Sequence, residues 1–324
     1  MAPKLSDYRT EVHNNWCPGC GDFGILSALQ MALSELQVEP HRAVVVSGIG
    51  CSAKTPHYIN AYGIHTLHGR AIAFAEGMKL ANPGLEVVAV SGDGDAMGIG
   101  GNHTLHAGRR NIDLTFIVFD NFVYGLTKGQ ASPTMAMGMK TKGLAKPNIQ
   151  QDINPIMLAL TAGYTFVARG YAFDIRHLKE LIKKGIQHKG SALIDVLQPC
   201  PTYNDVNTKE WYGGEDRLDE ETHRAVPRIY RLEETGYDPV VRSAGRDEEL
   251  SKLSQAMAKA TEWGDRIPIG VYYQNPYVPS FEERLEETRI PGYVRIPPAS
   301  LRISTPDGRP TTDMGRLFDL FRVT

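Results

Sequence analysis

Two polar groups that follow apolar stretches of the chain have the chemistry of ligands for a hard cation. Gly92-Asp93-Gly94 comes after the stretch 85–92, and Asn121 follows the stretch 114–120. Mg²⁺ takes about six oxygens, typically one or two protein groups together with phosphate oxygens and water. The glycines let the backbone approach phosphates without a Cβ in the way, and their N–H groups can bind them. The pattern predicts a magnesium-held diphosphate site.

A plain turn is the main alternative for residues 92–95, because Gly and Asp dominate turns. The position after one apolar stretch, with Asp120-Asn121 ending the next, favours the cation site. A calcium-binding loop fits poorly, since the acidic spacing and the closing Glu are absent. Residues 48–53 formally satisfy the G-x-G-x-x-A pattern of a dinucleotide-binding turn, but Pro56 stands where an apolar helix would have to open, so we reject that interpretation.

The cysteines form the second candidate site. There are four, Cys17, Cys20, Cys51 and Cys200, which are too few for a disulfide scaffold in a chain of 324 residues. The CxxC pair alone fits a zinc half-site, a dithiol pair or chance as well as an iron–sulfur ligand pair. Cys51 and Cys200 each follow a predicted strand, and both can join the pair at one edge of a parallel sheet. The spacing does not separate zinc from iron and sulfur.

An α/β fold must position these groups, because short β-branched runs alternate with longer helical stretches from about residue 20 to 200. Continuous apolar runs predict buried strands at 43–48, 85–92, 114–120, 164–170 and 192–198. Helices are predicted at 24–36, 69–80, 103–110, 155–163 and 173–188. Ligands bind outside the carboxyl ends of parallel strands, so Asp93 and Asn121 are expected to converge on one cation.

The chain changes character beyond Cys200, where it becomes charged and contains Pro and Trp. A helix near 247–263 and an apolar strand at 267–273 are predicted there. We expect a binding domain over 1–205 and an extension over 206–324 that packs on this domain or on a partner. The last forty residues hold several prolines and glycines and little periodicity, which predicts a wrapping tail.

Composition points to small-molecule chemistry. With 42% hydrophobic residues, 35 basic against 37 acidic side chains and a formal net charge of -2, the chain shows no long-range attraction to nucleic acid or to an anionic membrane. No apolar run approaches the roughly 20 residues that span a bilayer, and the first residues show no apolar signal-peptide core. We expect the protein to be cytoplasmic.

The motifs taken together resemble those of a known family, the β subunits of the 2-oxoacid:ferredoxin oxidoreductases, which include the pyruvate and 2-oxoglutarate enzymes. The resemblance covers about residues 10 to 280. Its motifs are WCPGCG at 16–21, SGIGCS at 47–52, HTLHGRA at 65–71, SGDGDAMGIGGNH at 91–103, DNFVYGLTKGQASPT at 120–134 and LQPCPTYN at 197–204.

The resemblance implies a role for individual residues. It implies a parallel sheet flanked by helices that forms a diphosphate-type thiamine diphosphate-binding domain. It implies one 4Fe-4S cluster held by Cys17, Cys20, Cys51 and Cys200, and Mg²⁺ held by Asp93, Asn121 and the carbonyl of Val123. The implied contacts of thiamine diphosphate are Ile49, Gly50, Cys51, Ser52, His68, Gly94, Asp95, Gly125 and Leu126.

Four further residues of these motifs are weighed separately. Lys54 and Lys128 are candidates for contact with the substrate carboxylate, although a lysine in a glycine-rich loop is more often simply solvated. For His65 and Arg70 we expect a structural role or a place near the phosphates rather than a catalytic one.

The implied reaction is a coenzyme A-dependent oxidative decarboxylation of a 2-oxoacid to acyl-CoA and CO₂, with one-electron transfer through the cluster to ferredoxin. Thiamine enzymes activate the cofactor with a Glu from a second, pyrimidine-binding domain, and this chain is too short to contain one. We therefore expect an α subunit that carries this domain, in a heterodimer or heterotetramer.

Two other classes of function are compatible with the same residues. One is a non-redox thiamine diphosphate carboligase or decarboxylase subunit with a structural zinc site. The other is a non-catalytic, cluster-carrying interaction subunit. The sequence does not specify the 2-oxoacid, because one hydrophobic position in a pocket changes discrimination by only ~1–3 kcal/mol.

Overall fold

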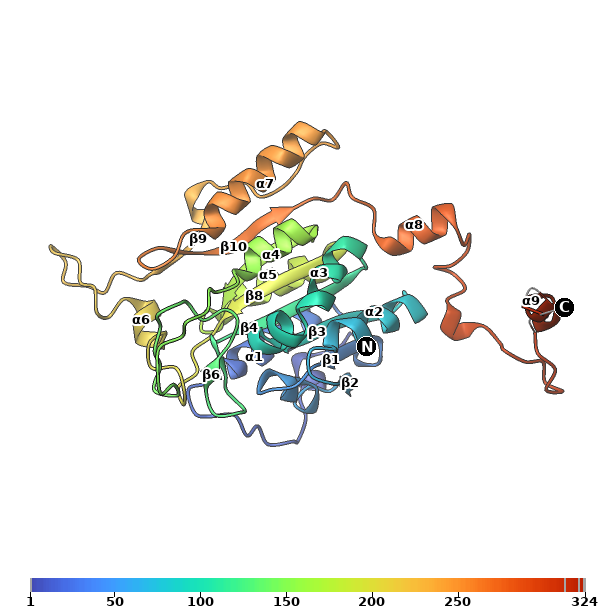
Figure 1. The fold of residues 1–324 in the computed structure, drawn as a ribbon, viewed down its shortest axis with the longest axis horizontal. Coiled ribbons are helices and arrows are strands. Elements are labelled where there is room, and N and C mark those ends of the chain that lie inside the picture. Colours follow the sequence, from blue (N-terminus) through green and yellow to red (C-terminus); the bar gives the residue numbers. More distant parts are fainter. Residues whose placement is uncertain (1, 312, 320, 323–324) are drawn as a thin grey trace.

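A single eight-stranded sheet organises the chain (Figure 1). The structure is a computed structural model that describes residues 2–311, 313–319 and 321–322. The strand order is β2-β1-β3-β4-β8-β7-β10-β9. The strands of this sheet are β1 (Ala43–Ser47), β2 (Tyr62–His65), β3 (Glu86–Gly92), β4 (Leu114–Asp120), β7 (Phe166–Tyr171), β8 (Ser191–Leu197), β9 (Ile229–Arg231) and β10 (Ile267–Gln274).

The five strands predicted between residues 43 and 198 are all present as β1, β3, β4, β7 and β8, and they run parallel. β3 and β4 are direct neighbours, with Gly92 opposite Phe119. The residues that follow these two strands therefore lie side by side at the carboxyl edge of the sheet. This confirms the placement expected for Asp93 and Asn121.

Helices cover both faces of the sheet, which is why its central strands are apolar throughout. Alternate residues of β1 enter opposite cores: Val45 packs in the core beneath α1 and α5, and Val44 in the core beneath the other helices. The first layer holds α1 (Asp22–Glu35) and α5 (Ile175–Gln187). The second holds α2 (Ala71–Ala81), α3 (Gly101–Arg110), α4 (Pro155–Ala162) and α7 (Arg246–Ala260).

The segment after Cys200 continues the same sheet. β10 pairs antiparallel with β7, and β9 pairs parallel with β10, so the sheet is mostly parallel. The predicted helix near 247–263 is α7, which packs on β10, and the predicted strand 267–273 is β10 itself. Between β8 and β9 lies the short helix α6 (Lys209–Gly213).

The C-terminal segment packs on the body only in its first part. α8 (Phe281–Thr288) begins with a capping box between Ser280 and Glu283, and the Tyr293 hydroxyl donates to the Leu80 carbonyl. Residues 301–311 are exposed, and the chain extends away from the body toward α9 (Met314–Asp319) (Figure 1). Leu301 and Ile303 are exposed to solvent, so the described tail beyond about residue 300 does not pack on the body of this chain, and its packing on a partner stays a prediction.

Within the described residues, no helix combines the length and the apolar character that a membrane crossing requires.

Candidate cofactor site

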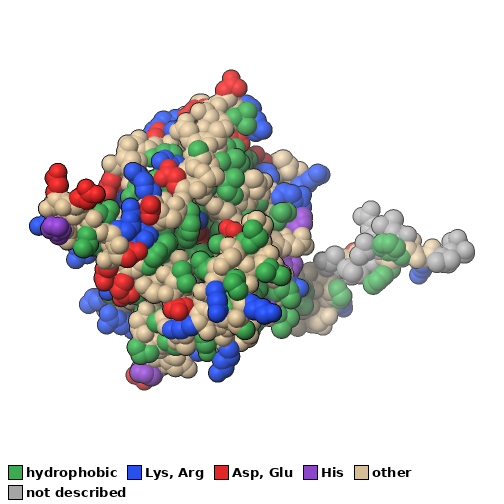
Figure 2. All heavy atoms as spheres, turned by 60° about the vertical axis from the view of Figure 1, so that its left-hand side comes forward, with side chains coloured by type: hydrophobic (Ala, Val, Ile, Leu, Met, Phe, Trp, Pro, Cys, Tyr) green, Lys and Arg blue, Asp and Glu red, His purple; other side chains and the backbone are tan. Residues whose placement is uncertain are grey.

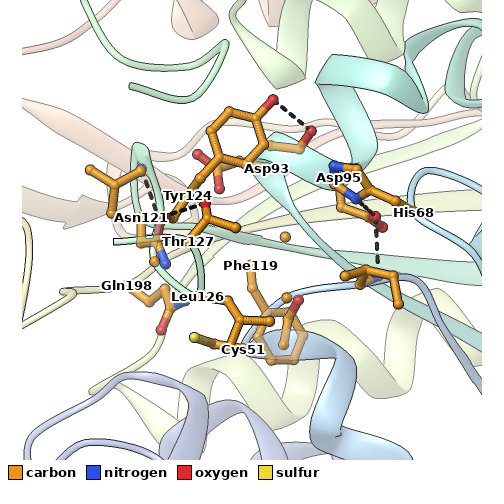
Figure 3. A pocket seen from close by; sticks show the side chains of 17 residues that line it. Cys51, His68, Asp93, Asp95, Phe119, Asn121, Tyr124, Leu126, Thr127 and Gln198 are labelled. Carbon is orange, nitrogen blue, oxygen red and sulfur yellow. Dashed lines mark hydrogen bonds and ion pairs between the residues drawn. The ribbon is translucent and has the colours of Figure 1, made fainter. Parts of the chain in front are cut away.

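A pocket opens where β1, β3 and β4 end at the carboxyl edge of the sheet (Figure 3). The predicted magnesium ligands Asp93, Asn121 and Val123 line it. Figure 3 shows Asp93 and Tyr124 on one side of the pocket and Cys51 and Gln198 on the opposite side. The predicted cofactor contacts line the pocket as well: Ile49, Gly50, Cys51, Ser52, His68, Gly94, Asp95, Gly125 and Leu126.

The Asp93 carboxylate is buried and is oriented through one of its two oxygens. Oδ2 accepts hydrogen bonds from the Ser132 hydroxyl at 2.5 Å, the Thr134 hydroxyl at 2.6 Å and the backbone N–H of Phe122 at 3.0 Å. These bonds leave Oδ1 outside the network, as a metal ligand requires. Sequence reasoning missed Ser132 and Thr134. Both belong to the stretch 120–134, but nothing in their spacing indicates that they reach Asp93.

Negative charge is concentrated behind this carboxylate. The Thr134 hydroxyl also lies 2.8 Å from Oδ1 of Asp120, which is fully buried. Burial raises the pKa of Asp93, and burial together with the nearby charges of Asp195 and Asp93 raises the pKa of Asp120. Arg169 pairs with Asp195 at 2.8 Å. The remaining carboxylates favour a cation at the pocket, because burying negative charge without a partner is costly.

Asn121 and Val123 are held by a small antiparallel hairpin of β5 (Val123–Tyr124) and β6 (Gln130–Ala131). The carbonyls of Phe122 and Tyr124 accept from the opposite arm, at 3.2 Å and 2.9 Å. The residue between them turns its backbone groups the other way, and the Val123 N–H donates to Asn121 Oδ1 at 3.0 Å. The carbonyl of Val123 therefore points to the same side as the Asn121 amide. An amide oxygen and a carbonyl there fit a magnesium ion.

Asn121 has a second support that sequence reasoning did not identify. The Asn204 side chain donates to the Asn121 carbonyl at 3.0 Å, and it is itself buried. Asn204 is the last residue of the motif LQPCPTYN, but nothing in the motif indicates that its side chain reaches Asn121.

Close packing requires a glycine at position 94, because a Cβ there would stand 2.3 Å from the Tyr124 ring. A Cβ on Gly92 would stand 3.4 Å from Ser52 Oγ, which is an ordinary contact at the pocket wall. The Ser52 hydroxyl is buried in the pocket wall and has no hydrogen-bond partner among the described residues. A hydroxyl of this kind, together with two glycines that line the pocket, fits the oxygens of a diphosphate.

Asp95 connects two loops at the base of the pocket. Its Oδ1 accepts from the backbone N–H of Ile49 at 3.1 Å and of Gly69 at 2.6 Å, and it pairs with His68 Nδ1. Its Oδ2 accepts from the Ser91 hydroxyl. These bonds hold the loop after β1 against the turn that carries His68, so contact of Asp95 with a cofactor remains a prediction.

Cys51 lies on the lower side of the pocket in Figure 3, and the other three cysteines lie near it. The sulfurs of Cys51 and Cys200 lie 3.6 Å and 3.8 Å from the point where a Cβ of Gly125 would stand. Cys17 and Cys20 share a tight turn, with the Cys20 N–H donating to the Cys17 carbonyl at 3.0 Å. Trp16 fixes this turn, because its indole N–H donates to the Cys51 carbonyl at 2.8 Å.

The thiols are free and largely shielded from solvent, except for Cys17, which is exposed. Burial and the nearby Asp22 carboxylate raise the pKa of the Cys51 thiol to about 11. Burial, and to a smaller extent the charge of Asp22, raises the pKa of the Cys20 thiol as well. A thiolate-binding metal group has to displace these protons.

Four thiols around one space fit a 4Fe-4S cluster in donor type and number. Among the described residues, no three His, Cys, Asp or Glu side chains are arranged to hold a single metal ion.

The other predicted residues lie outside the pocket lining. Lys54 donates to Asn15 Oδ1 at 2.9 Å, and Lys128 is exposed in the hairpin loop, where its φ is +89°. Their contact with a substrate carboxylate stays a prediction. His65 Nδ1 lies 3.0 Å from both the Ser47 hydroxyl and the Ala53 carbonyl, which is a structural role. Arg70 donates to the Ile99 carbonyl at 3.3 Å.

Two family models match successive parts of the chain, and known proteins are similar to it over nearly its whole length. Residues 48–196 match the family described as "Thiamine pyrophosphate enzyme, C-terminal TPP binding domain", and residues 226–289 match the family of the C-terminal part of the pyruvate ferredoxin oxidoreductase beta chain. A 2-oxoacid:ferredoxin oxidoreductase subunit beta of Saccharolobus solfataricus is 57% identical over 96% of this chain and 97% of its own. The subunit beta of 2-oxoacid:ferredoxin oxidoreductase 1 of Aeropyrum pernix is 53% identical over 98% of this chain and 96% of its own.

A solved structure extends the likeness to the whole fold. It is a 2-oxoglutarate:ferredoxin oxidoreductase from Magnetococcus marinus with 2-oxoglutarate, coenzyme A and succinyl-CoA bound. It superposes with a TM-score of 0.79 at 33% identity, over 99% of this chain and 97% of the other.

Proposed function

Because the chain belongs to the β subunits of the 2-oxoacid:ferredoxin oxidoreductases, we propose that it supplies one side of an active site that converts a 2-oxoacid and coenzyme A to acyl-CoA and CO₂. Its family acts as oxidoreductases with ferredoxin as the acceptor. The observation that carries the proposal is that Cys51 lines the same pocket as Asp93 and Asn121. One pocket thus joins the groups for a diphosphate cofactor to the groups for an electron carrier.

The residues of the pocket have separate tasks in this proposal. Asp93, Asn121 and the Val123 carbonyl hold Mg²⁺, and the glycines on either side of Asp93 present backbone to the diphosphate. Thiamine diphosphate held there would supply carbanion stabilisation at the keto carbon of the substrate, and a 4Fe-4S cluster held by the four cysteines would accept electrons singly. Ser132 and Thr134 keep the Asp93 carboxylate in one orientation, so the diphosphate end is fixed before substrate enters.

The cluster side of the pocket is built for electron exit. Cys51 follows Gly50 in the loop after β1 and reaches the pocket, whereas Cys17 reaches the surface. The four thiols thus extend from the pocket to solvent. A structural zinc ion in the same place could not use this route, because zinc does not carry electrons.

The site is completed by an α subunit in this proposal. The described residues that line the pocket include no glutamate, although thiamine enzymes need one to activate the cofactor. The two family matches end at residue 196 and begin at residue 226. Their spacing supports a division into a cofactor domain at 1–205 and an extension at 206–324, and we propose a cytoplasmic αβ or (αβ)₂ enzyme.

Reduction of methyl viologen tests the function. The chain is expressed alone and together with its α subunit, under anaerobic conditions, and each preparation is supplied with coenzyme A and either pyruvate or 2-oxoglutarate. We expect coenzyme A-dependent reduction by the complex and none by the single chain. Turnover by the single chain, or an inert complex that contains both cofactors, would overturn the proposal.

Metal analysis separates the proposal from a zinc-containing carboligase subunit. A 4Fe-4S cluster requires about four iron and four acid-labile sulfide per chain, whereas a zinc site with four cysteine ligands requires one zinc and no sulfide. We expect the iron and sulfide. Zinc in a wild-type complex that decarboxylates without reducing methyl viologen would favour the non-redox enzyme.

A further inference from the structure

A second groove lies beside the cysteines, on the surface and outside the cofactor pocket. It is lined by Gly19, Lys142, Phe173, Pro199, Pro201 and Lys209, with polar groups between them. Gly19 separates Cys17 from Cys20, and the two prolines flank Cys200. The groove therefore touches the backbone beside three of the four thiols. Figure 2 brings forward the side of the molecule with α6 and β6, where basic, acidic and hydrophobic side chains are intermixed in the lower half.

One loop brings positive charge to this groove. Residues 138–148 form a loop closed by the Gly138 N–H donating to Asn148 O at 2.7 Å and the Asn148 N–H donating to Met139 O at 2.8 Å. The loop contains Lys140, Lys142 and Lys146 and no acidic residue. The Lys142 ammonium group donates to the Pro201 carbonyl at 2.6 Å, which fixes the loop to the segment after Cys200.

The groove itself carries equal numbers of positive and negative side chains, and the loop adds further positive charge. Lys142 and Lys209 face Asp205 and Glu210 in the lining. The Asp205 carboxylate already accepts a hydrogen bond from the backbone N–H of Lys142 at 2.7 Å, so part of its hydrogen-bonding capacity is satisfied within the chain. Lys140 and Lys146 are exposed, and they add two positive charges to the balanced charges of the groove. The surface next to the thiols is therefore net basic.

On this same surface the set of four cysteines comes closest to solvent. Cys17 is exposed, and the exposed Thr202 hydroxyl donates to its sulfur at 3.0 Å. Cys51 and Cys20 are more shielded, and Cys200 is buried. A carrier that takes electrons from a cluster held by these thiols has its shortest approach at this point.

We propose that the groove and the loop 138–148 form the docking surface for the electron acceptor, a small acidic ferredoxin. This inference rests on the proposed cluster. The partner contacts Phe173 and the two prolines with its apolar centre, and its carboxylates face the lysines of the loop. Charges at the rim of an interface mainly set the association rate and its dependence on salt. The lysines are therefore expected to steer the ferredoxin, with the apolar groove fixing its distance from Cys17.

The test uses the αβ complex with two electron acceptors. The double variant Lys140→Glu/Lys146→Glu reverses charges that make no described side-chain contact, and Arg109→Glu/Lys184→Glu makes the same change on α3 and α5 as a control. Each is assayed with methyl viologen and with purified ferredoxin from Saccharolobus solfataricus, at low and at high salt. For the loop variant we expect a rise in KM for ferredoxin of about tenfold at low salt, a weaker salt dependence and an unchanged rate with methyl viologen.

Three results would overturn the docking surface. One is an unchanged KM for ferredoxin in the loop variant, and another is an equal rise in the control variant. The third is loss of the α subunit from the purified loop variant, which would assign the surface to that subunit. Failure of the wild-type complex with methyl viologen contradicts the proposed function instead, so the two failures are distinguishable.

Discussion

The orientation of a single carboxylate decides whether the pocket can hold a cation. Asp93 directs one oxygen toward three donors, two of them hydroxyls from Ser132 and Thr134. Thr134 also contacts Asp120 behind it. The buried carboxylates therefore share a small set of donors. Removing one donor frees Asp93 to rotate and leaves negative charge unpaired.

Replacement of Thr134 tests this arrangement. We expect Thr134→Val to weaken binding of thiamine diphosphate with Mg²⁺ by roughly 10- to 100-fold, because supports of metal ligands carry effects of this size. Thr134→Ser, which keeps the hydroxyl, is expected to bind almost as the wild type does. Isothermal titration of the αβ complex with the cofactor measures both. Wild-type affinity in Thr134→Val would contradict the role of this hydroxyl.

A buried histidine away from the site gives a pH dependence of stability. Burial lowers the pKa of His188 to about 4, and its Nε2 lies 2.7 Å from the Thr165 hydroxyl. In the unfolded chain this pKa returns to about 6.5. Between these values the unfolded state binds a proton that the folded state does not, so stability falls as pH falls. The loss between pH 7 and pH 5 is about 2 kcal/mol.

Urea unfolding at the two pH values checks this contribution. The variant His188→Gln should lose less stability than the wild type over the same interval, whatever its stability at pH 7. Equal pH dependence in His188→Gln and the wild type would show that His188 does not titrate in this way.

At the scale of elements, two helical glycines have opposite environments. Gly24 lies in α1, where a Cβ would stand 2.0 Å from the Ala172 carbonyl oxygen, whereas a Cβ on Gly77 in α2 would meet nothing within 4 Å. Gly24→Ala should destabilise the protein by about 1–3 kcal/mol, because backbone must move. Gly77→Ala should stabilise it by about 0.5–1 kcal/mol. Thermal unfolding measures both, and a stable Gly24→Ala variant would contradict this packing.

The elements that sequence patterns predict are those with continuous apolar runs. β3 and β4 could be predicted, and with them the convergence of Asp93 and Asn121, because parallel strands end at one edge. β2 could not, since its residues Tyr62, Gly63 and His65 are exposed at the sheet edge and carry no apolar signal. The antiparallel direction of β10 was also beyond sequence reasoning, because an apolar run does not encode the direction of a strand.

The supports of the site were less predictable than its ligands. Ser132 and Thr134 reach Asp93 only because the hairpin of β5 and β6 folds back over the end of β3. Asn204 reaches Asn121 from a loop without periodicity. Contacts of this kind depend on three-dimensional loop geometry, and the spacing of residue types in the sequence does not contain it.

At the scale of the whole molecule, the C-terminal segment divides into a packed and an extended part. The Phe281 N–H donates to Asn111 O at 2.9 Å, and the buried Glu282 accepts from the Asp113 N–H at 3.2 Å. Removal of the exposed residues after Ser300 should therefore leave the melting temperature of the isolated chain nearly unchanged. Removal from Ser280 onward should lower it by several degrees, at roughly 4 °C or less per kcal/mol lost. Equal melting temperatures for the two truncations would contradict the packed role of α8.

The complete assembly determines whether the two halves of the pocket work together. Asp93 lies on the cofactor side and Cys51 on the cluster side, so we expect substrate electrons to reach the cluster only when the cofactor is held. Electron paramagnetic resonance of the anaerobic αβ complex tests this link. It detects the reduced cluster independently of turnover, and iron analysis confirms that the cluster is present in each variant.

The decisive comparison is between the wild-type complex and Asp93→Asn, each mixed with coenzyme A and either 2-oxoglutarate or pyruvate. We expect at least one 2-oxoacid to reduce the cluster of the wild type, whereas the cluster of Asp93→Asn is reduced only by dithionite. A reduced-cluster signal of equal size in Asp93→Asn after addition of the 2-oxoacid would contradict the link between the cofactor site and the cluster.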